Sequence, residues 1–178
     1  TREKNYRYAC EVFSKVPVTP GKKKRVGITG EIYMKYSKLG NDDIESFLLR
    51  QGMEPYSGGF VNYCLYLVDT ERYKAEKYQH NPIMAKACAF VLHRLCEAQK
   101  HLLTVIGETD RFQTDLPFPE LKEKVQGILA EGCNTGDGWL IAAEVIQYVE
   151  KGCGSVLILH PFGCLVSHVC ERGILQRL

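Results

Sequence analysis

The run SVLILH at residues 155–160 constrains the fold more than any other segment, because it is the most strand-like stretch of the chain. The helical pattern WLIAAEVIQYVEKG precedes it, and another helix is expected soon after it. Two earlier runs, RVGITG and MEPYSG, also predict short strands, and the helical pattern NDDIESFLLRQG lies between them. Strands that alternate with helices are typical of an α/β fold with a parallel sheet, which we therefore predict.

Proline and glycine positions set the expected boundaries of the first strand–helix–strand unit. Asn41 is a suitable N-cap for the helix, and Gly52 is suited to end it. Pro55 restricts the second strand to a sheet edge or a strand end, because proline lacks a backbone N–H. The two strands and the helix between them predict one parallel βαβ unit.

The central part of the chain is predicted to be helical. Apolar residues at helical spacing recur on both sides of Pro82, and Pro119 is suited to the first turn of a further helix that continues to about residue 132. These patterns predict a helical insertion at roughly residues 59–131 within a single α/β domain of residues 1–178. Only three strands are visible and both ends resemble cuts, so we expect an incomplete fragment of a larger protein.

Composition excludes several classes of protein. The chain has 178 residues, 45% of them apolar, and a formal net charge of +2, which gives no case for binding nucleic acid or an acidic membrane surface. Its longest apolar run is far shorter than the ~20 residues that a membrane-spanning helix needs. It has eight cysteines but no CxxC pair and no signal peptide. We therefore predict reduced thiols in a cytoplasmic protein.

The predicted topology brings three loops and one helix start to the same edge of the sheet. Ligands of parallel sheets bind at the carboxyl ends of the strands. The segments that follow RVGITG, MEPYSG and SVLILH, and the turn NTGDGW before the helix that precedes SVLILH, all belong to this edge, which we call the rim. The candidate cofactor-binding residues on the rim are Gly30, Glu31, Tyr33, Asn134, Thr135, Gly136, Asp137 and Trp139.

Cys164 is the rim residue with the most distinctive chemistry. It lies near an expected helix N-terminus, where free N–H groups and the helix dipole favour a thiolate. Such a thiolate could be a nucleophile with His160 or His168 as its base, or a ligand of a soft metal. A helix would place Cys164 and His168 on one face, and a zinc site could add His160 and Cys170. The same stretch could also be a packed turn.

The two glycine-containing loops allow a structural as well as a functional interpretation. VGITGEIY contains neither GxGxxG nor a P-loop lysine–serine pair, so nucleotide hydrolysis by this chain is not supported. NTGDGW could bind an anion or a backbone group at the helix start, or it could be an ordinary capped turn. Glu31 and Asp137 could likewise be acid–base residues or carboxylates that stabilise turns.

Three segments in order resemble a known family. RVGITGEIYMKY, NDDIESFLLRQG and the C-terminal stretch from GCNTGDGW through HPFGCLVSHVCERG look like the acyl-CoA dehydratase activase-related proteins. These are similar to the D-component, a dehydratase subunit, of 2-hydroxyglutaryl-CoA dehydratase. The match covers both ends of the chain, whereas residues 70–118 match only in being helical.

This resemblance implies a Rossmann-like α/β fold and a cysteine-ligated iron–sulfur cluster. An ATP-dependent activator module delivers electrons to the dehydratase in such systems, so the resemblance implies that module, the remainder of a larger polypeptide and an acyl-CoA substrate as partners. Cys164 matches the family cysteine and is the first candidate ligand of a [4Fe–4S] cluster, which commonly takes four cysteines. Cys133 is a weaker candidate, and other ligands would come from segments outside the chain or from solvent.

The sequence departs from the family pattern around the cysteine. His160 stands where Gln is expected, Asp137 where Glu is expected, and Val166 and Ser167 replace Pro-Asn. Three hypotheses therefore remain. In the first, the chain is part of a dehydratase-like protein that acts in electron transfer or in dehydration of a CoA thioester. In the second, it is a non-catalytic scaffold of the same fold. In the third, it is a small zinc-binding module.

Overall fold

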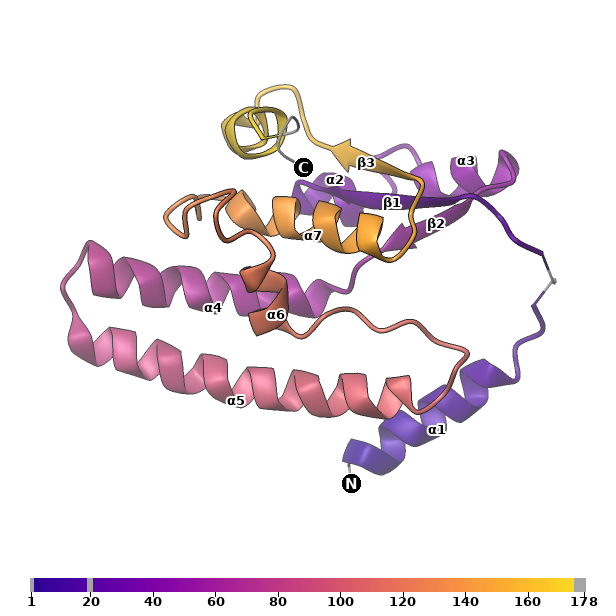
Figure 1. Cartoon of the computed structure of the whole chain (residues 1–178), viewed down its shortest axis with the longest axis horizontal. Helices are drawn as coiled ribbons and strands as arrows, with labels where there is room; N and C mark the ends of the chain where they lie inside the picture. Colours follow the sequence, from indigo (N-terminus) through magenta and orange to yellow (C-terminus); the bar gives the residue numbers. More distant parts are fainter. Residues whose placement is uncertain (1, 19–20, 175–178) are drawn as a thin grey trace.

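The computed structural model describes residues 2–18 and 21–174. Within these residues, three parallel strands form one sheet in the order β2-β1-β3 (Figure 1). The strands are β1 (Arg25–Gly30), β2 (Glu54–Ser57) and β3 (Ser155–Leu159). This arrangement confirms the predicted α/β fold with a parallel sheet, and it places β2, which contains Pro55, at an edge.

Helices surround this sheet and extend well beyond it (Figure 1). They are α1 (Arg2–Ser14), α2 (Ile32–Tyr36), α3 (Ile44–Arg50), α4 (Phe60–Lys77), α5 (Pro82–Gly107), α6 (Phe118–Glu123), α7 (Gly138–Glu150) and the π-helix η1 (Ser167–Arg172). Helices α4, α5 and α6 lie between β2 and α7 in the sequence, where the helical insertion was predicted. Across the described residues, no helix is both long and apolar enough to cross a membrane.

The alternation of side chains along β1 separates the two faces of the sheet. Val26 and Ile28 are buried and pack with Leu48 of α3. Thr29, one position further, points to the other face and donates a hydrogen bond to Glu144 of α7 at 2.5 Å. Because a strand places successive side chains on opposite faces, α3 and α7 cover opposite sides of β1.

Helix α7 forms the centre of the molecule because it is apolar nearly all round. Ten of its thirteen residues are buried. One side packs under the sheet, and the other contributes Trp139 to an aromatic cluster with Tyr66 of α4 and Phe118 of α6. The α4–α5 hairpin lies beyond this cluster, so α7 separates the sheet from the hairpin (Figure 1).

Three local predictions need correction. The segment after β1 was expected to be a loop, but residues Ile32–Tyr36 form α2. The helix expected to continue to residue 132 ends at Glu123, because the following N–H groups bond three residues back, in tight turns. The N-cap of α3 is Asp43, although the Asn41 side chain still accepts the Ile44 N–H at 3.3 Å.

Candidate functional site

The rim brings together the segments that the topology predicted. The chain leaves β1 at Gly30, and the next amide, of Glu31, donates to the carbonyl of Leu159 at the end of β3 at 2.8 Å. The backbone φ of Gly30 is +132°, and a Cβ there would lie 2.0 Å from the Leu159 oxygen. Glycine is therefore required where the two strands end side by side.

Glu31 and Asp137 meet at the N-terminus of α2. The Glu31 carboxylate accepts a hydrogen bond from the Met34 amide at 3.1 Å. The Asp137 carboxyl lies near the Ile32 amide, which favours its charged form and lowers its pKa. Burial, and after it the neighbouring Glu31, raises the pKa of Asp137 to about 6. Asp137 can therefore exchange a proton near neutral pH, while Glu31 also caps α2.

The NTGDGW segment is a tight turn that begins α7. The Gly138 amide donates to Thr135 and the Trp139 amide to Cys133, at 3.1 and 2.8 Å. Gly138 has a φ of +30°, and a Cβ there would lie 2.1 Å from the Cys133 carbonyl oxygen. These contacts fit the interpretation of the segment as a structured turn.

The predicted rim residues differ in their accessibility. Thr135, Gly136 and Tyr33 are exposed, whereas Asn134 is buried and its side-chain N–H₂ has no hydrogen-bond partner in the described structure. The Trp139 side chain is only 1% exposed and packs in the core, because the first turn of α7 directs it toward α4 and α6. The indole therefore does not face the rim.

Cys164 lies at the predicted place, directly before the last helix, and is partly buried. Its Sγ accepts a hydrogen bond from the Ser167 hydroxyl at 3.1 Å. The flanking histidines lie near each other, with ring centroids 5.5 Å apart. However, His160 and His168 bond to the carbonyls of Pro161 and Phe162, both at 3.1 Å. Among the described residues, the hydrogen bond to the Cys164 thiol comes from Ser167, so neither ring is its hydrogen-bonded base.

The other candidate ligands have separate surroundings. The thiol of Cys133 lies beside that of Cys170, and burial, followed by this neighbour, raises the pKa of Cys170 to about 11. Within residues 2–18 and 21–174, no three His, Cys, Asp or Glu side chains are grouped so that they could hold a metal ion. The zinc site considered from the sequence therefore has no preformed geometry in the part of the chain described.

Glu171 is a rim carboxyl that the sequence did not single out. Its side chain is buried, and neither carboxyl oxygen has a hydrogen-bond partner in the described structure. Burial raises its pKa, and the nearby Ser167 hydroxyl opposes this rise more than His160 and His168 do. Glu171 also contributes to the raised pKa of Asp137. The rim therefore contains more acidic groups than the motifs indicated.

The sequence analysis also did not predict a buried ion pair under the rim. The Lys35 Nζ lies 2.8 Å from both carboxylate oxygens of Glu144, and each side chain is less than a tenth exposed. Burial alone would lower the pKa of Lys35, but Glu144 and Tyr36 outweigh burial and raise it.

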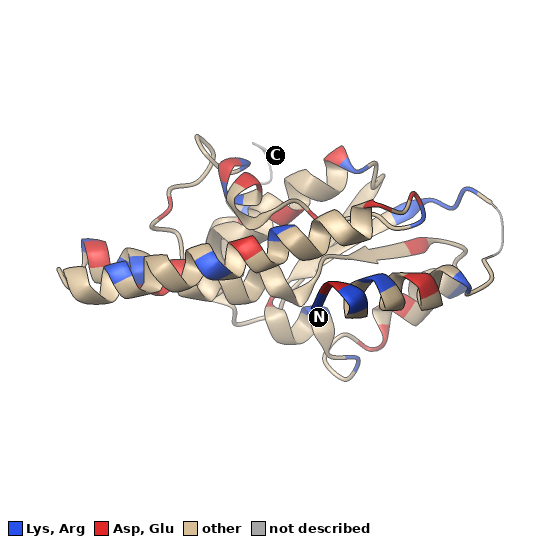
Figure 2. Ribbon diagram, turned by 90° about the horizontal axis from the view of Figure 1, so that it is seen from below, with Lys and Arg blue, Asp and Glu red and all other residues tan. Residues whose placement is uncertain are grey.

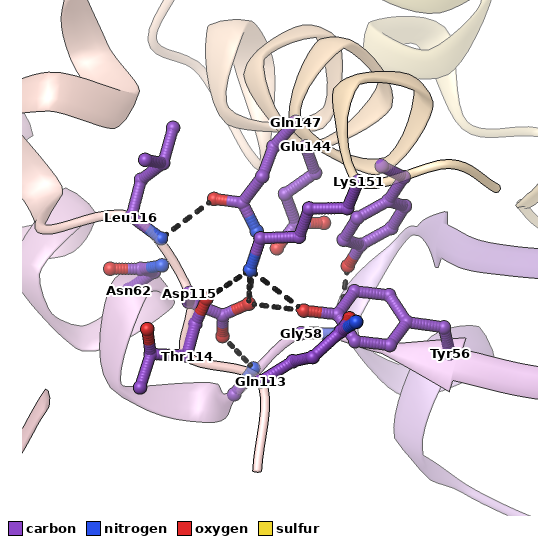
Figure 3. Close-up of polar contacts among 12 residues, drawn as sticks. Tyr56, Gly58, Asn62, Gln113, Thr114, Asp115, Leu116, Glu144, Gln147 and Lys151 are labelled. Atoms are coloured by element: carbon purple, nitrogen blue, oxygen red, sulfur yellow. Dashed lines mark hydrogen bonds and ion pairs between the residues drawn. The ribbon is translucent and has the colours of Figure 1, made fainter. Parts of the chain in front are cut away.

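A second polar network anchors the loop between α5 and α6 (Figure 3). Asp115 accepts hydrogen bonds from the Tyr56 hydroxyl, the Gln147 amide and the Gly59 backbone at 3.1, 2.9 and 2.9 Å. Lys151 donates to the same Tyr56 hydroxyl at 2.9 Å. Because these groups come from β2, α7 and the loop, the network fixes the helical layer to the sheet.

The carboxyl edge of the sheet is thus an acidic rim that includes the Cys164 loop and lies beside the buried helix α7. Comparison of the chain with protein-family models, with curated proteins and with solved structures finds no match.

Proposed function

We propose that this chain is a Rossmann-like unit of a protein related to the acyl-CoA dehydratase activases, and that its rim is the functional surface. The position of Cys164 supports the proposal most. The cysteine that the resemblance singles out lies at the carboxyl edge of a parallel sheet, directly before a helix. Ligands of such sheets bind at this edge.

The described residues do not fit a complete iron–sulfur site. A [4Fe–4S] cluster commonly takes four cysteine ligands, and no group of three possible ligands occurs within residues 2–18 and 21–174. The proposal therefore gives Cys164 the role of one ligand, and the remaining ligands come from another polypeptide segment. Cys133 stays the weaker candidate because the family pattern does not single it out, and its thiol lies beside that of Cys170.

The surface around Cys164 has exposed apolar side chains that another polypeptide could cover. Phe162 is 96% exposed, and Leu165 and Val169 are also largely exposed. Large apolar side chains gathered on one short segment are typical of an interaction site. A partner that covers them would also exclude water from Cys164. In a dehydratase-like system, that partner belongs to the larger protein or to its ATP-dependent activator, and the substrate is an acyl-CoA.

Acidic residues of this chain are placed to support a cluster site at the rim. Asp137, with a pKa of about 6, can hold or release a proton beside Glu31. The buried Lys35–Glu144 pair fixes α2 to α7 underneath. In this proposal, the protein orients the groups and controls protons, while a bound cluster would supply electron transfer.

A second candidate is a non-catalytic scaffold of the same fold. It is favoured because both histidines beside Cys164 bond to backbone carbonyls and Glu31 caps α2. Every one of these groups already has a structural role, and a fold alone does not determine function.

Anaerobic reconstitution separates the two candidates. The whole chain is incubated with ferric iron, sulfide and dithiothreitol, which reduces part of the iron and whose thiolates stand in for the missing ligands, and is then desalted. We expect wild type and the control Cys88→Ala to retain iron and sulfide in equal amounts, and Cys164→Ala to lose both. Equal retention by all three proteins, or none by wild type, would favour the scaffold.

A further inference from the structure

Two thiols of this chain lie side by side although they belong to distant segments. Cys133 lies in the segment before α7, and Cys170 lies in η1. Packing of these segments places the thiol of Cys133 beside that of Cys170. The proposed function gives Cys170 no role, so the pair needs an interpretation of its own.

Contacts around the pair hold η1 against the start of α7 (Figure 1, Figure 2). A Cβ on Gly136 would lie 3.3 Å from Cγ2 of Val166, the residue directly before η1. After η1, Ile174 is buried in the same apolar cluster as Trp139 and Leu140 of α7. Both ends of η1 therefore pack near the start of α7, and this packing brings the two cysteines together.

The backbone of both cysteines is held in place by the fold. The Cys133 N–H donates to the Ala130 carbonyl at 2.9 Å, and the Cys133 carbonyl accepts the Trp139 N–H at 2.8 Å. Cys170 lies within the helical turns of η1. A disulfide forms readily only between cysteines that the backbone holds close together. A bond between these two sulfurs would therefore join segments that already lie against each other.

The two thiols are exposed to different degrees. Cys133 is partly exposed, whereas Cys170 is only 5% exposed. Burial, and after it Cys133, raises the pKa of Cys170 to about 11, so this thiol stays protonated at neutral pH. A dissolved oxidant therefore meets Cys133 first. An accessible cysteine next to a second cysteine that can react with it is typical of a redox-sensitive site.

We propose that Cys133 and Cys170 are a redox-sensitive pair that a hydroperoxide converts into a disulfide. The Cys133 sulfur attacks an oxygen of the hydroperoxide, the O–O bond breaks, and the products are a sulfenic acid and water or an alcohol. The Cys170 sulfur then attacks the sulfenic sulfur, the S–O bond breaks, and the Cys170 proton leaves with the hydroxyl group as water. Together the two thiols lose two electrons, which the hydroperoxide gains.

The bridge closes a loop that contains α7, β3 and the Cys164 segment. Closing this loop reduces the conformations of the unfolded chain, so the bridge stabilises the fold and fastens η1 to the start of α7. A dithiol reductant reverses the bridge by thiol–disulfide exchange. The inference is independent of the proposed function, because neither thiol needs a bound cluster to react.

Disulfide mapping of the whole chain tests the pair directly. The reduced chain is desalted, treated with hydrogen peroxide at neutral pH and alkylated in urea, and its peptides are analysed by mass spectrometry without reduction. We expect a Cys133–Cys170 bridge in wild type and in the control Cys64→Ala. Cys153, which is 6% exposed, is the buried control and should be recovered as an alkylated thiol. A pair that stays reduced while Cys64 is oxidised, or a bridge from Cys133 to Cys164 instead, would overturn the proposal.

Trapping of the sulfenic acid tests the order of the two steps. Dimedone, which reacts with sulfenic acids, is added during the peroxide treatment. We expect it to label Cys133 in the Cys170→Ala variant and this label to be lost in wild type, because Cys170 consumes the sulfenic acid. Equal labelling of Cys133 in the two proteins would show that Cys170 does not react with it, against the proposal.

Urea denaturation tests the restraint on η1 and needs no variant at the buried Cys170. We expect peroxide to raise the urea midpoint of wild type and dithiothreitol to return it, because the bridge constrains the unfolded chain. Cys133→Ala should show neither change. A bridged wild-type chain that unfolds at the same midpoint as the reduced chain would contradict the proposed restraint.

Discussion

At the scale of single residues, the rim depends on buried charges whose partners lie far apart in the sequence. Lys35 and Glu144 are 109 positions apart, and the ion pair they form joins α2 to α7. An ion pair in such a place stabilises little in itself, but the loss of one partner leaves a buried charge without compensation. Residue-scale predictions therefore concern the removal of one charge at a time.

The Lys35→Met variant leaves Glu144 buried and uncompensated. We expect the free energy of unfolding to fall by about 3–5 kcal/mol, as measured by urea denaturation at pH 7. Adding Glu144→Gln should recover part of this loss. Lys15→Met, which removes an exposed pair with Glu11, should change stability by less than ~0.5 kcal/mol. A loss below ~1 kcal/mol in Lys35→Met would show that the pair is dispensable.

Asp137 makes stability depend on pH. Its pKa rises from 3.8 to about 6 on folding, so the native state binds the proton more tightly. The stabilisation that this gives is complete below pH 4 and is lost as the pH rises through 6. We expect Asp137→Asn to raise the urea midpoint at pH 7, with no difference from wild type below pH 4. Asp110→Asn is the exposed control, and an equal midpoint for Asp137→Asn and wild type at pH 7 would contradict the raised pKa.

At the scale of elements, the strand ends determine where the rim lies. Strand β1 pairs with β2 over residues 25–28 and with β3 over residues 26–30, and its last residue, Gly30, pairs with Leu159. The close approach at that point allows Glu31 to begin α2 beside the turn that starts α7. The arrangement of the rim therefore depends on Gly30, which allows the ends of β1 and β3 to lie this close.

The Gly30→Ala variant tests this dependence. Its Cβ would meet the Leu159 backbone at 2.0 Å in a backbone conformation that side chains rarely adopt. We expect the free energy of unfolding to fall by ~3 kcal/mol or more, as measured by urea denaturation. At Gly163, a Cβ would meet nothing within 4 Å. Gly163→Ala should therefore match wild type, and similar stability of the two variants would argue against the strand-end geometry.

At the scale of the whole molecule, sequence patterns predicted the parallel sheet, the edge position of β2 and the common edge of Glu31, Asp137 and Cys164. These features follow from local periodicity and from the rule that parallel strands share a carboxyl edge. Helix α2 was missed because five residues are too few to show a helical period.

Contacts between distant segments were not predictable in the same way. The Asp115 network and the pairing of Cys133 with Cys170 depend on how the helical layer packs on the sheet. The core position of Trp139 also depends on that packing, because sequence places the residue at the start of α7 but does not fix the direction of its side chain.

The central claim, that Cys164 on the rim is a cluster ligand, is tested most directly by alkylation. The chain is treated with iodoacetamide before and after loading with iron and sulfide, and each cysteine is quantified by mass spectrometry. We predict that loading protects Cys164 but leaves the exposed Cys64 equally reactive. Equal alkylation of Cys164 in both forms, or a chain that retains no iron, would contradict the claim.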